Sequence, residues 1–188
     1  MNDKHRVRVS KFISKHLRHA PAEIGLTLEP GGWVGVDTLL AAAGAHGFLI
    51  SRAELEEVVA KCDKQRCAFD ETGTRIRANQ GHSVEVDLEL DPAVPPELLY
   101  HGTALRTLPL ILDGGLLKMA RHHVHLSRDF ETALKVGGRH GKPVVLSVAA
   151  GKMAGDGFTF FVSSNGVWLV DRVPPTYLSV IPTDSATT

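Results

Sequence analysis

Residues 84–97 constrain the fold more than any other stretch, because their composition is unsuited to a packed element. Apolar and acidic residues alternate first, and Asp91-Pro92 and Pro95-Pro96 follow. Proline removes a backbone donor and restricts the residue before it, so this pattern is typical of a connection between folded parts. We therefore predict two lobes, residues 1–83 and 98–188, joined by a linker over 84–97 with room for one strand.

Length and charge narrow the classes of protein. The 188 residues can form one large or two small domains, each with its own core. The 21 basic and 21 acidic residues exclude a globally cationic nucleic-acid binder but permit a local basic patch. No apolar run approaches the ~20 residues of a membrane helix, and no signal-peptide segment opens the chain. Cys62 and Cys67 lack zinc-site spacing. We expect a reduced, cytoplasmic protein without a membrane anchor.

The first lobe has the order of a winged-helix module. Apolar spacing predicts a helix over residues 8–20, Asp37 is expected to cap a short helix, and a capping box at Ser51 opens the next one. Residues 66–70 and 74–78 then form a hairpin. Because the third helix is too acidic for a good recognition helix, we predict a platform rather than a sequence reader.

The second lobe is rich in strands, with two small helices, and predicts an α+β fold for the chain. Its expected elements are a helix capped by Thr103 that ends at Gly114-Gly115, a strand at 124–127, a helix at 129–136, a buried strand at 143–148 and a hairpin of 158–162 with 167–170.

Two arginines alternate with apolar residues at the end of the predicted hairpin. Arg75 and Arg77 leave the strand on one face, while Asn79-Gln80-Gly81 turns the chain. Two guanidinium forks on one face suit a phosphate. The alternative is a solvated edge strand with no ligand.

Further cations come from both lobes. Arg18 and His19 lie in the last turn of the first helix, where simple capping of the helix dipole would also explain them. Gly138-Arg139-His140-Gly141-Lys142 is a basic loop whose alternative reading is a solvated loop tip. Neither a catalytic carboxylate pair nor a Ser-His-Asp order accompanies these cations. Such a set suits an anionic, phosphate-bearing substrate.

Common cofactor motifs are missing from the sequence. There is no G-x-G-x-x-G, and Gly141-Lys142 lacks the first glycine and the hydroxyl residue of a phosphate loop, which excludes an ATPase. On a strand, His122 would face away from His123 and His125, so we expect no metal. His101-Gly102-Thr103 stands at a strand-to-helix junction, where the histidine either contacts a small ligand or is a satisfied structural residue.

The chain resembles the RNA 2′-phosphotransferase family, the NAD-dependent enzymes of tRNA splicing and their bacterial relatives. The matching motifs are Ser14-Lys15-His16-Leu17-Arg18-His19, Gly32-Trp33-Val34, Arg75-Ile76-Arg77-Ala78-Asn79-Gln80-Gly81-His82-Ser83, Tyr100-His101-Gly102-Thr103, His125-Leu126-Ser127 and Asn165-Gly166-Val167-Trp168-Leu169. They span nearly the whole chain in the family's order, and the Arg-Ala-Asn-Gln-Gly-His-Ser string is the most specific.

The resemblance implies a winged-helix RNA-binding lobe followed by an ADP-ribosyltransferase-like NAD-binding lobe. The implied catalytic residues are Arg18, His19, Arg77 and Arg139. The implied NAD contacts are His101, Gly102, Thr103, His125, Leu126, Ser127, Asn165, Gly166 and Val167. Support of the RNA phosphate falls to Arg75, Asn79, Gln80, His82, Lys15 and His140. Val167 stands where protein ADP-ribosyltransferases usually carry glutamate.

The resemblance also implies a two-step reaction with NAD as co-substrate and no metal. An internal RNA 2′-phosphate displaces nicotinamide, and the resulting RNA 2′-phospho-ADP-ribose yields 2′-hydroxyl RNA and ADP-ribose 1″,2″-cyclic phosphate. We expect a cytoplasmic monomer that acts on tRNA-like RNA. The alternatives are an ADP-ribosyltransferase that modifies nucleic-acid terminal phosphates without the second step, and a winged-helix binding protein with an inert second lobe.

Overall fold

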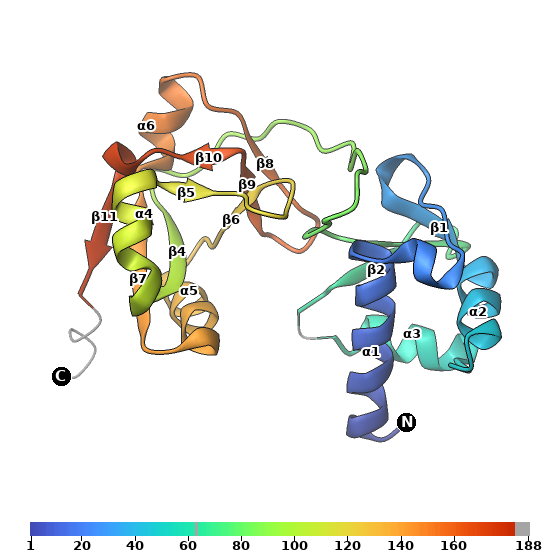
Figure 1. Cartoon of the computed structure of the whole chain (residues 1–188). Coiled ribbons are helices and arrows are strands. Elements are labelled where there is room, and N and C mark those ends of the chain that lie inside the picture. The colour runs from blue at the N-terminus through green and yellow to red at the C-terminus, as the bar shows by residue number, and fades with distance from the viewer. Residues whose placement is uncertain (63, 183–188) are drawn as a thin grey trace. The chain divides into compact units, whose positions relative to one another are not determined.

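The computed structural model describes residues 1–62 and 64–182, apart from the side chain of His140. The chain forms two compact units, the N-terminal unit Met1–Glu89 and the C-terminal unit Leu90–Thr188, drawn from blue to green and from green to red in Figure 1. Their boundary falls inside the stretch 84–97, whose assignment as a linker stays a prediction. Each unit has its own apolar core.

Helices surround the core of the N-terminal unit. They are α1 (Asp3–Arg18), α2 (Val36–Ala45) and α3 (Arg52–Ala60), with 3-10 turns η1 (Pro21–Ile24) and η2 (Pro30–Gly32). The side chain of Asn2 accepts a hydrogen bond from the His5 amide, so α1 begins well before the predicted start at residue 8.

The predicted caps of the next two helices have different outcomes. The capping box of α3 is confirmed, because Ser51 and Glu54 exchange side chain-to-backbone hydrogen bonds. The expectation that Asp37 caps α2 is wrong. Gly35 is the N-cap residue, and the Val36 amide donates instead to the Thr74 carbonyl at 2.9 Å, so a strand connection sets the start of this helix.

An antiparallel sheet completes the N-terminal unit. Its strands β1 (Trp33–Gly35), β3 (Arg75–Ala78) and β2 (Cys67–Phe69) lie in that order. The predicted hairpin of β2 and β3 is confirmed. Because β3 is paired on both sides, the alternative of an edge strand is wrong. Ile76 and Ala78 are fully buried, whereas the alternating arginines leave on the other face.

The C-terminal unit mixes short helices with antiparallel strands. Its elements are β4 (Leu99–Ala104), η3 (Leu105–Thr107), α4 (Leu108–Gly114), β5 (Leu116–Leu117), β6 (Val124–Leu126), α5 (Phe130–Gly137), η4 (Gly138–His140), β7 (Pro143–Val148), α6 (Ala150–Gly155), β8 (Phe160–Val162), β9 (Trp168–Val170), β10 (Arg172–Val173), η5 (Pro175–Tyr177) and β11 (Leu178–Ile181). The chain is therefore mixed α and β, compatible with the predicted α+β class.

Two of its sheets hold the predicted motifs. One has the order β11-β7-β4, and the other has the order β6-β9-β8. Strand β7 is central and largely buried, as predicted, and β8 with β9 is the predicted hairpin. A further pair, β5 with β10, lies outside these sheets. Among the described residues, no helix combines the length and apolarity that crossing a bilayer requires.

The expectation that Thr103 caps a helix is wrong. Thr103 lies within β4, which stays paired with β7 as far as Ala104, so its backbone is extended. Its hydroxyl is 2.7 Å from the Thr107 hydroxyl. The helix begins later, at Leu108, and ends at Gly114 with Gly115 beyond it, as predicted.

Candidate functional site

Arg77 on β3 contacts a backbone carbonyl and an aromatic ring. Its Nη1 donates to the Gly31 carbonyl at 3.3 Å, and its guanidinium lies 4.6 Å from the centre of the Trp33 ring. Burial lowers the pKa of Arg77, although an arginine stays charged at neutral pH. Among the described residues, no carboxylate lies within salt-bridge distance of Arg77, and its buried Nε has no hydrogen-bond partner. The Glu89 carboxylate acts on Arg77 in the opposite direction to burial, without an ion pair at salt-bridge distance, so a partly desolvated cation remains that favours an anionic ligand.

Arg75, two residues earlier on the same face, is engaged by carboxylates. Its Nε lies 3.2 Å from Asp70, its Nη1 lies 3.9 Å from Glu29, and its guanidinium lies 5.3 Å from the Trp33 ring centre. The hydrogen bond from the Arg75 amide is the largest cause that lowers the pKa of the Asp70 carboxyl. A role for Arg75 in supporting an RNA phosphate stays a prediction, and these contacts weaken the case for it.

The end of α1 is tied to the segment that follows β3. Arg18 Nη2 donates to the Arg66 carbonyl at 3.0 Å, and the Asn79 amide donates to the same carbonyl at 3.0 Å. The Ser83 amide donates to the Arg18 carbonyl at 2.9 Å, and the Ser83 hydroxyl is 2.9 Å from Nδ1 of His19. The fold thus brings together, within one unit, two motifs that are about sixty residues apart in the sequence.

The turn after β3 is packed inside its unit. Asn79 is 6% exposed and His82 is 1% exposed. Asn79 Nδ2 donates to the Gln65 carbonyl at 2.6 Å, and a Cβ at Gly32 would lie 3.4 Å from His82 Nε2. Gln80 between them is half-buried. Burial of Asn79 and His82 favours a structural part in shaping the turn over direct contact with RNA.

Lys15 on α1 is exposed and forms an ion pair with Glu23. Its hydrogen bond is the main cause that lowers the pKa of the Glu23 carboxyl. Its charge is therefore paired with a carboxylate at salt-bridge distance, unlike that of Arg77, and its predicted support of an RNA phosphate remains untested.

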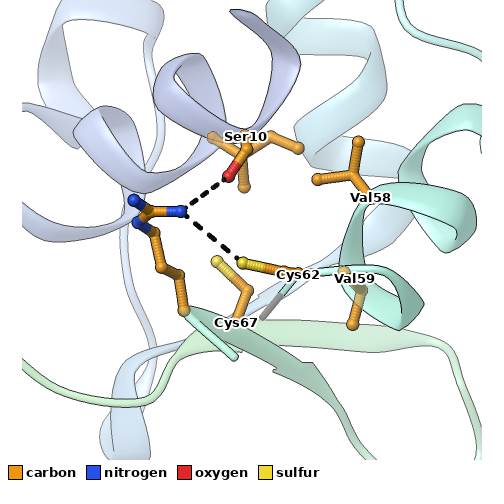
Figure 2. Close-up of a pocket in the computed structure, with 7 residues that line it drawn as sticks. Ser10, Val58, Val59, Cys62 and Cys67 are labelled. Carbon is orange, nitrogen blue, oxygen red and sulfur yellow. Dashed lines mark hydrogen bonds between the residues drawn. The ribbon is translucent and has the colours of Figure 1, made fainter. Parts of the chain in front are cut away.

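A small pocket lies between α1, α3 and β2 of the N-terminal unit (Figure 2). It is lined by Ser10, Ile13, Val58, Val59, Cys62, Arg66 and Cys67. Arg66 Nη1 lies 3.3 Å from the Ser10 hydroxyl and 3.6 Å from the Cys62 sulfur. These contacts fix the position of Arg66, whose carbonyl accepts the hydrogen bond from Arg18.

The two thiols in that pocket differ in acidity. Burial raises the pKa of Cys62, but hydrogen bonds and the charge of Arg66 outweigh it, and the net shift is downward. Burial raises the pKa of Cys67 to about 12. Both are free thiols, Cys62 just beyond α3 and Cys67 on β2.

In the C-terminal unit, two histidines of the predicted NAD site are linked. His101 on β4 donates from Nδ1 to the His125 carbonyl at 3.1 Å, and burial lowers the pKa of His101. Arg121 Nη1 donates to His125 Nδ1 at 2.9 Å. Because arginine can only donate, Nδ1 of His125 accepts and its Nε2 carries the proton. Neutral His101 therefore presents a ring acceptor at Nε2, which suits a ligand with hydroxyl groups.

Sequence reasoning missed Arg121. It lies outside every family motif quoted above, and it precedes His125 by four residues. The one signal in the sequence was a cation four residues before the candidate ligand-binding histidine. The hydrogen bond between Arg121 and His125 depends on the bend at 121–123 that leads into β6, which the sequence does not show.

Gly102 brings β4 into direct backbone contact with α5. A Cβ at Gly102 would overlap the Ala133 carbonyl and lie 2.9 Å from the Gly137 nitrogen. A Cβ at Gly137 would lie 2.8 Å from the Thr103 carbonyl oxygen. Two facing glycines thus permit a strand-helix approach that no side chain would allow. Gly102 has a packing reason to be glycine, whether or not it contacts a ligand.

The remaining predicted NAD residues lie at two places. Leu126 on β6 is buried, and Ser127 exchanges backbone hydrogen bonds with Tyr100. The other group, Asn165-Gly166-Val167, forms the turn between β8 and β9. Buried Ser163, which sequence reasoning missed, organises that turn by accepting from the Val167 amide and contacting the Asn165 side chain at 2.7 Å.

The basic loop of the C-terminal unit is short and partly helical. Arg139 is exposed on η4, directly after α5. The side chain of His140 lies outside the described part of the chain. His122 and His123 precede β6 rather than lying on it, so the expected alternation of these histidines on a strand is wrong. Among residues 1–62 and 64–182, no group of three His, Cys, Asp or Glu side chains is arranged to hold a metal ion.

Comparison with known proteins shows the family. A model of the "RNA 2'-phosphotransferase, Tpt1 / KptA family" matches residues 4–172. A protein of Trichormus variabilis is 62% identical over 181 residues, covering 96% of this chain and 100% of its own length. Proteins of Streptomyces griseus (58% over 185 residues, 95% and 98% coverage) and Agrobacterium fabrum (55% over 177, 94% and 95%) are also similar. All three carry the name "Probable RNA 2'-phosphotransferase". The chain belongs to the RNA 2′-phosphotransferase family.

Proposed function

We propose that this chain is an NAD-dependent RNA 2′-phosphotransferase that acts in the cytoplasm as a monomer. The names of its relatives support removal of a 2′-phosphate from RNA. The observation that carries the proposal is Arg77, which is partly desolvated, contacts the Gly31 carbonyl and the Trp33 ring, and is influenced by the Glu89 carboxylate without lying at salt-bridge distance from it. A dianionic phosphate monoester could pair with the charge of such an arginine and accept its hydrogen bonds.

We further propose a division of labour between the units. The helices and the small antiparallel sheet of the N-terminal unit support a winged-helix RNA-binding lobe. The C-terminal unit would be the ADP-ribosyltransferase-like lobe that binds NAD. Its fit to NAD rests on the ring acceptor of His101, which matches a hydroxyl group of a ribose.

In the proposed reaction, the RNA 2′-phosphate displaces nicotinamide from NAD and leaves as ADP-ribose 1″,2″-cyclic phosphate, so that the RNA regains a 2′-hydroxyl. A phosphate monoester is already ionised near neutral pH, so this nucleophile requires positioning more than a base. Valine at 167, in place of a glutamate, is compatible with that requirement.

In the second step the ADP-ribose 2″-hydroxyl oxygen attacks the phosphorus and gives up its proton, while the bond between phosphorus and the RNA 2′-oxygen breaks. Arg18, Arg77 and Arg139 would stabilise the charge that builds on the phosphoryl oxygens. His19 would donate a proton to the departing 2′-oxygen, because an imidazole can exchange protons near neutral pH. Its contact with Ser83 would orient the ring.

The test incubates the protein with NAD and an oligonucleotide that carries one internal 2′-phosphate. The expected products are 2′-hydroxyl RNA, nicotinamide and ADP-ribose 1″,2″-cyclic phosphate. A stable ADP-ribosylated RNA would instead indicate the alternative, an ADP-ribosyltransferase for nucleic-acid phosphates. Unchanged NAD would leave only a binding protein. The unphosphorylated oligonucleotide and the Arg139→Ala variant are the controls, and both should give little or no product.

A further inference from the structure

We infer that Trp33 is a positioning residue that fixes the Arg77 guanidinium for phosphate binding without itself pairing with its charge. This inference rests on the proposed function, and it assigns a role to the tryptophan of the Gly32-Trp33-Val34 motif, which is not among the catalytic, NAD-binding or phosphate-supporting residues that the family resemblance implies.

The sheet register places the two side chains together. Trp33 on β1 is the direct partner of Arg77 on β3 in an antiparallel pair, so both side chains leave on the same face of the sheet. The guanidinium lies over the indole, 4.6 Å from the ring centre, which is within the range of an attractive cation–π contact. The indole is half-buried, which reduces the screening of this contact by water.

The turn before β1 supplies a second neutral partner. The Gly31 carbonyl accepts from Arg77 Nη1 at 3.3 Å. Gly31 has a φ of +76°, and a Cβ there would lie 2.8 Å from Cδ1 of Trp33. Only glycine can adopt this backbone while the indole packs against it. The same residue thus aims a carbonyl at Arg77 and leaves room for the ring beneath it.

The chemistry of these partners explains why they suit a phosphate-binding arginine. A carboxylate would orient the guanidinium but also neutralise it and compete with the phosphate. An aromatic face and a single carbonyl orient the group without pairing with its charge. The Glu89 carboxylate also acts on Arg77, but at longer range than the two carboxylates that engage Arg75. Arg75 is the internal contrast, because it approaches the same indole at 5.3 Å and yet is held by Asp70 and Glu29.

A competing role for Trp33 is that of a stacking platform for an RNA base, which tryptophan often provides. That role predicts a loss of affinity for every RNA, with or without the phosphate. Positioning of Arg77 predicts a loss confined to the phosphorylated RNA and dependent on Arg77.

The experiment measures binding of two oligonucleotides of the same sequence, one with an internal 2′-phosphate and one without, in the absence of NAD. The parent should prefer the phosphorylated oligonucleotide. Trp33→Leu should reduce this preference about tenfold, the middle of the range for a partly desolvated cation–π contact. Trp33→Phe keeps an aromatic face and should retain most of the preference.

Double-mutant cycles then show whether Trp33 acts through Arg77. In an Arg77→Ala background, Trp33→Leu should change the preference less than about twofold, because the group it positions is gone. In an Arg75→Gln background, it should still cost about tenfold. An equal loss in the Arg77→Ala background, or an equal loss of affinity for the unphosphorylated oligonucleotide, would overturn the inference.

Two measurements keep the outcomes distinct. Thermal unfolding shows whether each variant is folded, and if Trp33→Leu is not, Trp33→Phe and Gly31→Ala are compared instead, with the glycine variant expected to cause the larger loss. Turnover with NAD is measured separately on the parent. Preference that depends on Trp33 without any turnover would retain the inference and reject the proposed function. Turnover by the parent, together with a preference that Trp33→Leu does not change, would support the proposed function and reject the inference.

Discussion

Burial acts on a candidate ligand-binding residue in each unit, but it leaves one of them charged and the other neutral. In the N-terminal unit, burial lowers the pKa of Arg77, but an arginine begins so far above neutral pH that it stays charged. In the C-terminal unit, burial lowers the pKa of His101, which begins at 6.5, and the ring becomes neutral. The same physical effect therefore leaves one site suited to phosphate and the other suited to hydroxyl groups.

The largest expected effect is on the arginine of the N-terminal unit. Arg77→Ala should lower kcat/KM for a 2′-phosphorylated oligonucleotide on the order of 10²-fold or more, as removal of a preorganised oxyanion donor does. Arg75→Ala is the matched control from the same strand and face, and should cost only a few-fold because two carboxylates already engage that arginine. Equal losses for the two variants would show that their different partners are irrelevant to function.

A second prediction concerns the glycine contact of the C-terminal unit. Gly102→Ala should lower the free energy of unfolding of that unit by roughly 1–3 kcal/mol or more, because the new methyl group meets the backbone of α5. In Gly155→Ala the methyl group meets nothing within 4 Å, so its stability should be equal or slightly higher. Urea unfolding measures both.

The separate roles of the units sharpen that second prediction. The Gly102→Ala variant should still prefer the 2′-phosphorylated oligonucleotide in a binding assay, because Arg77 and Trp33 lie in the other unit. Loss of this preference at a temperature where the N-terminal unit is folded would contradict the proposed division of labour.

The neutral state of His101 predicts a pH dependence of stability. Below its ordinary pKa of 6.5, the unfolded chain binds a proton that the folded chain does not, since burial lowers the folded pKa. The contribution is therefore complete above pH 6.5 and is lost as the pH falls below it, with a slope of at most about 1.4 kcal/mol per pH unit for one group. His101→Gln should flatten this decline.

Each unit contains one tryptophan, which allows that decline to be assigned. In a Trp33→Phe background, the fluorescence of Trp168 reports on the C-terminal unit alone. Exposed His46 of the N-terminal unit provides the control variant, His46→Gln, which should leave the decline unchanged. Burial also lowers the pKa of His123, so His123→Gln should flatten the decline in part. An unchanged profile in His101→Gln would refute the neutral buried state.

The smallest effect is expected at Lys15. Its ion pair with Glu23 is exposed, and such pairs contribute little. Lys15→Gln should therefore change kcat/KM for the phosphorylated oligonucleotide less than about threefold at moderate ionic strength. A loss comparable to that of Arg77→Ala would place Lys15 directly on the phosphate.

Local signals in the sequence predicted much of the fold. The capping box at Ser51, the hairpin of β2 with β3 and the turn between β8 and β9 each depend on residues a few positions apart. Helix α6 was not predicted, because glycines at both ends of Ala150–Gly155 resemble a loop. A backbone hydrogen bond from Gly151 to Glu97 and the buried Met153 hold it in place.

Non-local contacts explain what the sequence could not show of the candidate site. The alternation of Arg75 and Arg77 correctly predicted a shared face, but the two arginines differ because Asp70 and, from a distant segment, Glu29 lie at salt-bridge distance from Arg75 alone. The link between His101 and His125 likewise depends on how β4 and β6 meet in the fold. Residue identity indicated the candidates, whereas charge compensation and tautomer required the structure.

The unequal thiols of the pocket beside Arg66 make the protein suitable for selective labelling. Cys62 and Cys67 are the only cysteines, and both lie in the N-terminal unit. At mildly alkaline pH, a maleimide fluorophore should attach to the more acidic Cys62 well before Cys67. A dye on the Cys62 sulfur would lie beside Arg66, whose carbonyl accepts a hydrogen bond from Arg18. Its emission could then follow RNA binding in real time without a cysteine having to be introduced.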